Sequence, residues 1–136
     1  MIKKILIYFV LAFFSPTVFC AWTLIYENPE KEAKYYVDLD ALVKRKNAIR
    51  MMTLEDFKAP VIIKKNSYKL SYNSIRSFSE FDCGQKKMRI LSYSVYPSQM
   101  GNGDPLISKG APFDWMPVKS NTLNEAYLQI ACQEGQ

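Results

Sequence analysis

Two cysteines are the first residues whose type and spacing could carry chemistry. Cys83 and Cys132 are the only cysteines that follow the N-terminal segment, which holds Cys20. A catalytic thiol needs a neighbouring base, usually histidine, and the sequence contains no histidine and no Cys-x-x-Cys motif. If the segment that holds Cys20 exports the chain and is removed, two cysteines remain, and an even number in an exported chain favours a structural disulfide. We therefore predict a bridge between Cys83 and Cys132.

A pair of carboxylates is the second candidate for chemistry. Glu80 and Asp82 are two residues apart, so on a strand they share one face. Two carboxylates can perform glycoside hydrolysis, but such a pair more often forms a solvated strand face. Basic residues that could balance it are Arg76, Lys87 and Arg89. We predict no catalytic residue, no metal site and no cofactor, since histidine, the commonest base and metal ligand, is absent.

Basic residues form three clusters along the sequence, each of which could bind an acidic partner. The simpler interpretation is a soluble surface with lysine-protected turns. Acidic partners of this kind include a host matrix protein, a heparin-like sugar or lipopolysaccharide. Without Lys3 and Lys4, the eighteen basic residues become sixteen against thirteen acidic ones, too small an excess for nucleic-acid binding. The candidate ligand-binding residues are Lys44, Arg45, Lys46, Lys64, Lys65, Lys86, Lys87 and Arg89.

The N-terminal segment has the pattern of a signal peptide. Lys3 and Lys4 precede an apolar run from Ile5 to Phe14, which is too short to span a bilayer. We predict a signal peptide over residues 1–20, with cleavage after Cys20. Alternatives are lipidation of Cys20, for which Phe19 is a poor neighbour, and a retained anchor. The predicted location is periplasmic or secreted, with the outer-membrane surface as a further alternative.

Residues 21–136 are predicted to form one α+β domain with no membrane span. Alternation of apolar and polar residues predicts strands over 21–26, 34–38, 48–57, 68–83 and 88–96, with a short sixth strand at 106–107. Asp38 is expected to cap one helical turn over 38–43. Residues 58–66 are expected to form a loop or an edge segment. The expected fold is therefore an antiparallel sheet of about five to six strands.

The clearest expected helix follows Thr122. Thr122 and Glu125 have the spacing of a capping box. One apolar stripe follows, made of Leu123, Ala126, Tyr127, Ile130 and Ala131. We predict that this C-terminal helix packs on one face of the sheet, that the disulfide tethers it there, and that Trp115 anchors the core or rim beneath it.

The sequence also resembles a known family. The strongest signals are the Glu80–Cys83 segment and the strand that begins with Arg89-Ile90-Leu91-Ser92. Supporting positions are Trp22, Tyr36, Asp38, Arg45-Lys46, Ile49-Arg50-Met51, Ser74-Ile75-Arg76, Tyr96, Trp115, Pro117-Val118 and Cys132. In these residues the chain is similar to the surface-adhesin protein E family of Gram-negative bacteria. The resemblance implies a sheet with a disulfide-tethered C-terminal helix, and adhesion to host matrix and serum proteins.

Two functions fit the sequence better than an enzyme. The first is an exported, non-catalytic binding module that resembles surface-adhesin protein E and binds host or envelope macromolecules. The second is a periplasmic envelope protein that assists or inhibits another protein. An enzyme ranks last, because the chain has no histidine and, once the disulfide forms, no free thiol after residue 20.

Overall fold

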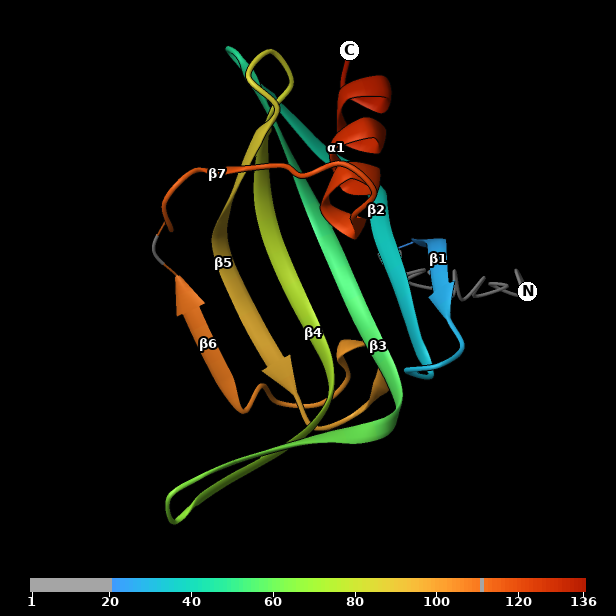
Figure 1. The fold of residues 1–136 in the computed structure, drawn as a ribbon, viewed down its shortest axis with the longest axis vertical. Coiled ribbons are helices and arrows are strands. Elements are labelled where there is room, and N and C mark those ends of the chain that lie inside the picture. Colours follow the sequence, from blue (N-terminus) through green and yellow to red (C-terminus); the bar gives the residue numbers. More distant parts are fainter. Residues whose placement is uncertain (1–20, 111) are drawn as a thin grey trace, which may run out of the picture.

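Alternating side chains along five long segments build one antiparallel sheet (Figure 1). The computed structural model describes residues 21–110 and 112–136; the predicted signal peptide and Cys20 lie outside the described residues. Strands β1 to β6 pair in sequence order, and β7 pairs with the start of β5. The elements are β1 (Trp22–Asn28), β2 (Ala33–Arg45), β3 (Ala48–Lys65), β4 (Tyr68–Asp82), β5 (Lys87–Tyr96), the 3-10 turn η1 (Gln99–Gly101), β6 (Ile107–Gly110), β7 (Met116–Pro117) and α1 (Leu123–Glu134).

Strand β2 is longer than its sequence predicts. The expected helical turn over 38–43 is wrong, because β2 resumes its pairing with β3 at Val43, opposite Arg50. The register is irregular between Asp38 and Val43, and the backbone N–H of Asp40 donates to Asp38 Oδ1 at 3.1 Å. Asp38 therefore makes a short local turn within a strand, the same side-chain bond that would have capped a helix.

Strand β3 also extends further than expected. Of the two alternatives predicted over 58–66, the loop is wrong and the edge segment agrees with the structure. β3 continues to Lys65 and pairs with β4 from Val61 onwards, while its pairing with β2 ends at Phe57. The register is irregular between Asp56 and Val61, and Pro60 lies within that interval, where its missing N–H removes no ladder bond. The β-branched run Val61-Ile62-Ile63 then favours a strand.

The C-terminal helix begins at the predicted cap. The backbone N–H of Glu125 donates to Thr122 Oγ1 at 3.3 Å, and Glu125 Oε2 accepts from the N–H of Asn121 at 2.8 Å. Helix α1 buries Tyr127 and Ala131, as predicted, and also Leu128, which the predicted stripe omits. These three join one buried cluster with Val37, Ile49, Met51, Phe81 and Met88 from β2 to β5.

The predicted disulfide is confirmed. Cys83 follows β4 directly and is bonded to Cys132 in α1, with a Cα–Cα distance of 5.8 Å. Phe81, two residues before Cys83, is fully buried in the cluster that α1 shares. The bridge thus joins the end of β4 to the last turns of the helix. None of the helices in the described part of the chain is long and apolar enough to cross a membrane.

Candidate binding surface

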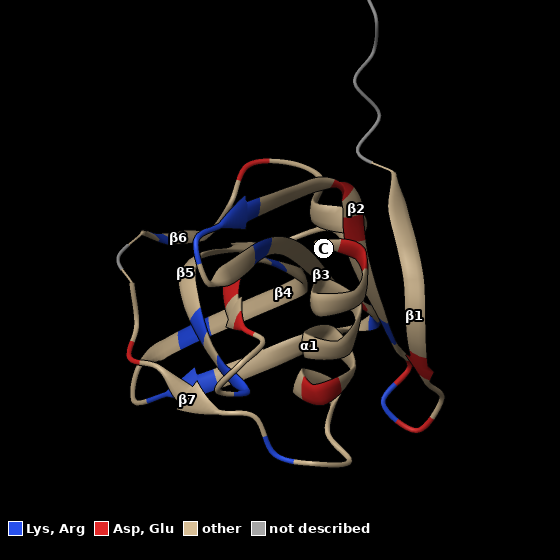
Figure 2. Cartoon of the chain, turned by 90° about the horizontal axis from the view of Figure 1, so that it is seen from above, with Lys and Arg blue, Asp and Glu red and all other residues tan. Residues whose placement is uncertain are grey.

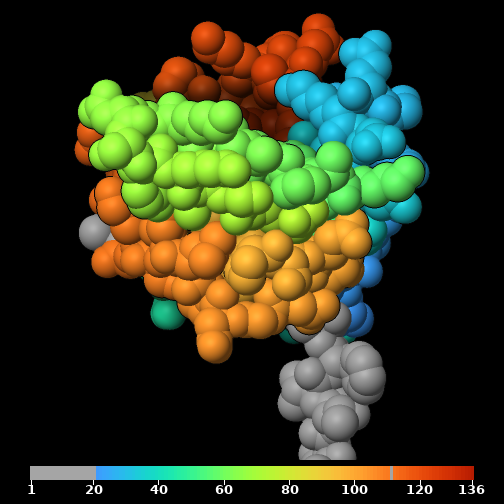
Figure 3. All heavy atoms as spheres, turned by 90° about the horizontal axis from the view of Figure 1, so that it is seen from below, coloured from blue at the N-terminus to red at the C-terminus, as the bar shows by residue number. Residues whose placement is uncertain are grey.

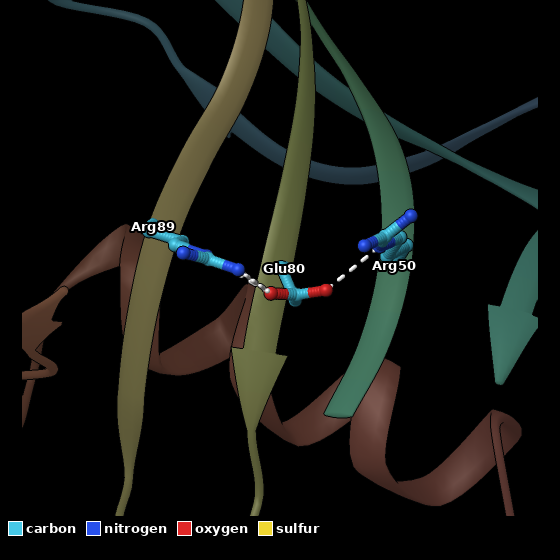
Figure 4. A network of polar contacts seen from close by, with 3 residues as sticks. All are labelled: Arg50, Glu80 and Arg89. Carbon is cyan, nitrogen blue, oxygen red and sulfur yellow. Dashed lines mark hydrogen bonds and ion pairs between the residues drawn. The ribbon is translucent and has the colours of Figure 1, made fainter. Parts of the chain in front are cut away.

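One glutamate and two arginines form a row of side chains across three neighbouring strands (Figure 4). The register places Glu80 of β4 opposite Arg50 of β3 on one side and opposite Arg89 of β5 on the other. Arg50 Nε donates to Glu80 Oε2 at 2.7 Å. Arg89 donates to Glu80 Oε1 from Nε at 2.9 Å and from Nη2 at 2.7 Å. We call Arg50, Glu80 and Arg89 the shared-carboxylate row.

The alternation of side chains along the strands determines which face of the sheet carries this row. Ile49 and Met51 flank Arg50 on β3, and both belong to the buried cluster that includes α1. Successive side chains on a strand point to opposite faces, so the row lies on the face away from that cluster. The Glu80 side chain is only 5% exposed, whereas those of Arg50 and Arg89 are 28% and 27% exposed. The two arginine side chains are therefore partly exposed, whereas the carboxylate is buried.

Electrostatics keeps the Glu80 carboxyl ionised. Burial alone would raise its pKa, but the hydrogen bonds and charges of Arg50 and Arg89 outweigh burial, and the net pKa is lowered. One carboxylate balances only one of the two guanidinium charges. The expectation that Glu80 lies on a solvated face is wrong, while Arg89 is one of the balancing residues named from the sequence.

Trp115 extends the row beyond β5. Met116 pairs with Met88, so Trp115 comes beside Arg89, and the Arg89 guanidinium lies 4.6 Å from the centre of the indole ring. The side chain of Trp115 is 38% exposed. Its predicted place beneath the helix is therefore wrong: it stacks on a guanidinium at the surface. The row thus presents a cation beside an exposed aromatic ring.

The predicted basic clusters separate into two ends of the sheet. Lys44, Arg45 and Lys46 lie at the β2–β3 turn, and Lys86 and Lys87 at the β4–β5 turn. These turns are neighbours, since Asn47, Asp82, Gly84 and Gln85 line one shallow depression between them. Figure 2 looks onto this end and shows basic segments on several strands with acidic ones among them. Lys64 and Lys65 lie at the tip of the β3–β4 hairpin, at the opposite end (Figure 1).

Sequence reasoning missed Arg50 and the role of Trp115. Arg50 is a single basic residue between Ile49 and Met51, so no cluster marks it. Its alternation with two apolar residues does predict that it lies opposite the buried face. The register of a hairpin that turns at Gly84 is enough to predict that Arg89 lies beside Glu80. Placing Arg50 there also requires the pairing of β3 with β4.

The other perturbed carboxyl has a different environment. Burial raises the pKa of Glu55, and the charge of Lys31 offsets part of this rise. Burial, with the Glu55 charge, also raises the pKa values of Tyr35, Tyr72 and Tyr127. These shifts follow from an acid and three phenols packed together. Among the described residues, no group of three or more Asp, Glu or Cys side chains is placed to hold a metal ion.

The chain thus combines an extended antiparallel sheet, a helix linked to it by a disulfide, and a surface on which an arginine stacks on a tryptophan. The chain belongs to the surface-adhesin protein E family, whose model matches residues 22–133. Its fold is similar to Haemophilus influenzae protein E. Crystal form II of that protein has a TM-score of 0.60 at 15% identity over 75% of this chain and 83% of that one. A second structure has a TM-score of 0.57 at 14% identity, over 73% and 76%. No curated protein matches the sequence significantly.

Proposed function

We propose that residues 21–136 form a non-catalytic exported module that binds an acidic macromolecule of the host or the cell envelope. The signal peptide over residues 1–20 would direct the chain out of the cytoplasm and be removed. Helix α1 would pack on one face of the sheet, held by the disulfide. The face that carries the shared-carboxylate row would then remain available to the partner.

The observation that carries this proposal is the excess cation of the row. The row holds two guanidinium groups and one buried carboxylate, a net charge of +1, and its Arg89 guanidinium lies beside the exposed ring of Trp115. The β2–β3 and β4–β5 turns add Lys44, Arg45, Lys46, Lys86 and Lys87 at the same end. Arginine and tryptophan are enriched where proteins bind one another, because each combines a large contact area with directional polar groups.

Family membership supports a binding role rather than turnover of a substrate. Members of this family are described as surface adhesins. In the row, Glu80 is held ionised by both arginines, so it is unsuited to donate a proton at neutral pH. Sulfated sugars, serum proteins and matrix proteins with acidic surfaces are the partners that this surface would suit.

Binding to immobilised heparin tests the proposal, with the processed protein purified from cells that express the full-length chain. We expect Lys86→Glu with Lys87→Glu to weaken binding at least tenfold, and added salt to reduce the difference, as for an electrostatic contact. Lys31→Glu with Lys109→Glu is the matched control, since it makes the same charge change on exposed residues elsewhere. Equal binding by all three proteins would contradict a role for this end of the sheet.

Protease shaving of intact cells tests where the module acts. Loss of the domain from intact cells would place it on the surface, where an adhesin must be. Protection until the outer membrane is opened would favour the alternative function, an envelope protein that assists or inhibits another protein. The heparin assay does not depend on this outcome.

A further inference from the structure

The β3–β4 hairpin continues well past the body of the sheet. Its last five cross-strand pairs run from Val61 opposite Tyr72 to Lys65 opposite Tyr68. We call residues 61–72 the arm. Figure 1 shows the arm reaching beyond the other strands, and Figure 3 shows it as a green band across that end of the molecule. All residues from 62 to 69 are exposed.

The arm exposes apolar side chains that nothing in the described chain covers. Ile62 is 50% exposed, Ile63 46% and Tyr68 55%. Alternation places Ile63 and Tyr68 on one face of the arm and Ile62 on the other. An isolated two-stranded hairpin is marginal in water, so large exposed apolar residues on both its faces indicate a partner.

The charges of the arm are all positive. No acidic residue occurs between Asp56 and Glu80, whereas the arm carries Lys64, Lys65 and Lys69. Lys64 lies directly opposite Lys69 in the register, a like-charge pair that weakens the hairpin. Within the described residues, neither lysine forms an ion pair. The arm therefore combines uncompensated cations with apolar residues on both faces.

We propose that the arm lies in the interface of an anionic lipid membrane. A protein groove would engage one face of a hairpin, whereas a lipid interface surrounds an embedded hairpin and accepts apolar side chains from both faces. Tyr68 at the tip has the amphipathic ring that is enriched at membrane interfaces. Lysines around apolar residues suit an anionic interface, because ammonium groups contact the headgroups while the apolar side chains enter the acyl boundary. This inference does not rest on the function proposed above, which involves the opposite end of the sheet.

Vesicle co-sedimentation tests the proposal. The full-length chain would carry Cys20→Ala, so that no lipid can be attached there, and the exported, processed protein would be purified. Vesicles of phosphatidylcholine with phosphatidylglycerol are compared with phosphatidylcholine alone. We expect binding only to the anionic vesicles, weakened about thirtyfold by Lys64→Gln with Lys69→Gln. The control, Lys109→Gln with Lys119→Gln, removes the same charge from exposed residues outside the arm and is expected to bind like the parent.

A second variant separates insertion from adsorption by charge. Ile63→Ser with Tyr68→Ser keeps every lysine and is expected to lose about tenfold or more in vesicle binding. Because these side chains are exposed, the denaturation midpoint should stay close to that of the parent, which shows that the variant is folded. Equal losses in the arm and control lysine variants, parental binding by the serine variant, or equal binding to neutral vesicles would each overturn the proposal. Arm-dependent binding to polyglutamate without vesicle binding would also overturn it, in favour of an acidic protein.

Discussion

Arg50 and Arg89 hold opposite oxygens of the same Glu80 carboxylate, at 2.7 Å from Oε2 and 2.7 Å from Oε1. Neither arginine is near the other in sequence, and the carboxylate lies on the strand between them. The row therefore links β3, β4 and β5 on the face away from the core cluster. It also fixes the Arg89 guanidinium over Trp115, so the same contacts that stabilise the sheet shape its surface.

Glu80→Gln should destabilise the domain by roughly 2 to 3 kcal/mol. The amide keeps one acceptor oxygen, so it can bond only one of the two arginines, and its loss of charge leaves both guanidinium groups without a carboxylate. Urea denaturation of the variant and the parent measures the difference. Glu30→Gln, a change at an exposed turn residue, is the matched control and should stay within about 0.5 kcal/mol. An unchanged midpoint in Glu80→Gln would mean that the row adds no net stability.

The lowered pKa of Glu80 gives a pH dependence of known sign. The folded state holds the proton more weakly than the unfolded state, so the contribution of Glu80 is complete above the ordinary pKa of 4.5. That contribution is lost as pH falls below 4.5 towards the lowered pKa. We expect the parent to lose stability over this interval more steeply than Glu80→Gln. Parallel curves of unfolding free energy against pH for the parent and Glu80→Gln would show that Glu80 is not the source of this pH dependence.

The contribution of Glu55 to stability should depend on pH in the opposite direction. Its pKa is raised, chiefly by burial, so the folded state binds its proton more tightly than the unfolded state does. Its ionisation therefore costs stability as pH rises from 4.5 through the raised pKa. Glu55→Gln removes that cost. We therefore expect the free energy of unfolding of the variant, compared with that of the parent, to be higher at neutral pH than at pH 4. A gain that does not depend on pH would point to packing instead of charge.

Cys132→Ser should cost about 4 kcal/mol under oxidising conditions. The bridge joins residues separated by 49 positions, and closing a loop of that length removes freedom from the unfolded chain. The denaturation midpoint of the variant should match that of the parent measured with a reducing agent present. Equal midpoints for the oxidised parent and Cys132→Ser would show that the bridge does not stabilise the fold.

Most of this fold can be predicted from local sequence patterns, because each of these elements depends on residues that are close together in the sequence. The capping box at Thr122 depends on four residues, and the strand from 88 to 96 depends on alternation within itself. The cysteine pairing follows from having only two candidates after the N-terminal segment. The C-terminal helix, the strands that form β1, β4 and β5, and the disulfide are accordingly confirmed.

What the sequence does not predict depends on register between distant strands. Pro60 looks like a strand terminator, but the irregularity between Asp56 and Val61 accommodates it. Glu80 looks solvated until the β3–β4 pairing brings Arg50 to its second oxygen. Leu128 falls outside the ideal stripe, yet it is buried in the same cluster as Tyr127. Each case requires a partner that local periodicity cannot identify.

Trp115→Ala tests whether the aromatic end of the row contributes to binding. The ring is exposed and stacks on Arg89, so its removal should lower stability by no more than about 1 kcal/mol. Heparin binding should fall several-fold, because the Arg89 guanidinium loses the surface that orients it. Phe113→Ala removes a comparably exposed ring, which contacts Tyr93, and serves as the control. Identical losses for both variants would argue against a specific role for Trp115.

Gly101→Ala should destabilise the domain by about 2 kcal/mol or more. Gly101 has φ of 64°, in the left-handed region, and a methyl group there would collide with the guanidinium of Arg76. Arg76 has little room to move, since it lies 5.8 Å from the centre of the Trp22 ring and 5.3 Å from that of Tyr96.

Gly110→Ala is the matched control for this glycine. A methyl group at Gly110 meets no atom within 4 Å, and its φ lies outside the left-handed region, so its effect should stay within about 0.5 kcal/mol. Thermal or urea denaturation of both variants measures the contrast. If Gly101→Ala were as stable as Gly110→Ala, the turn at η1 would have to be free to move away from Arg76. The bonds from Ser74 Oγ to Ser98 O at 2.6 Å and from the Gly101 N–H to Ser74 Oγ at 2.8 Å oppose that movement.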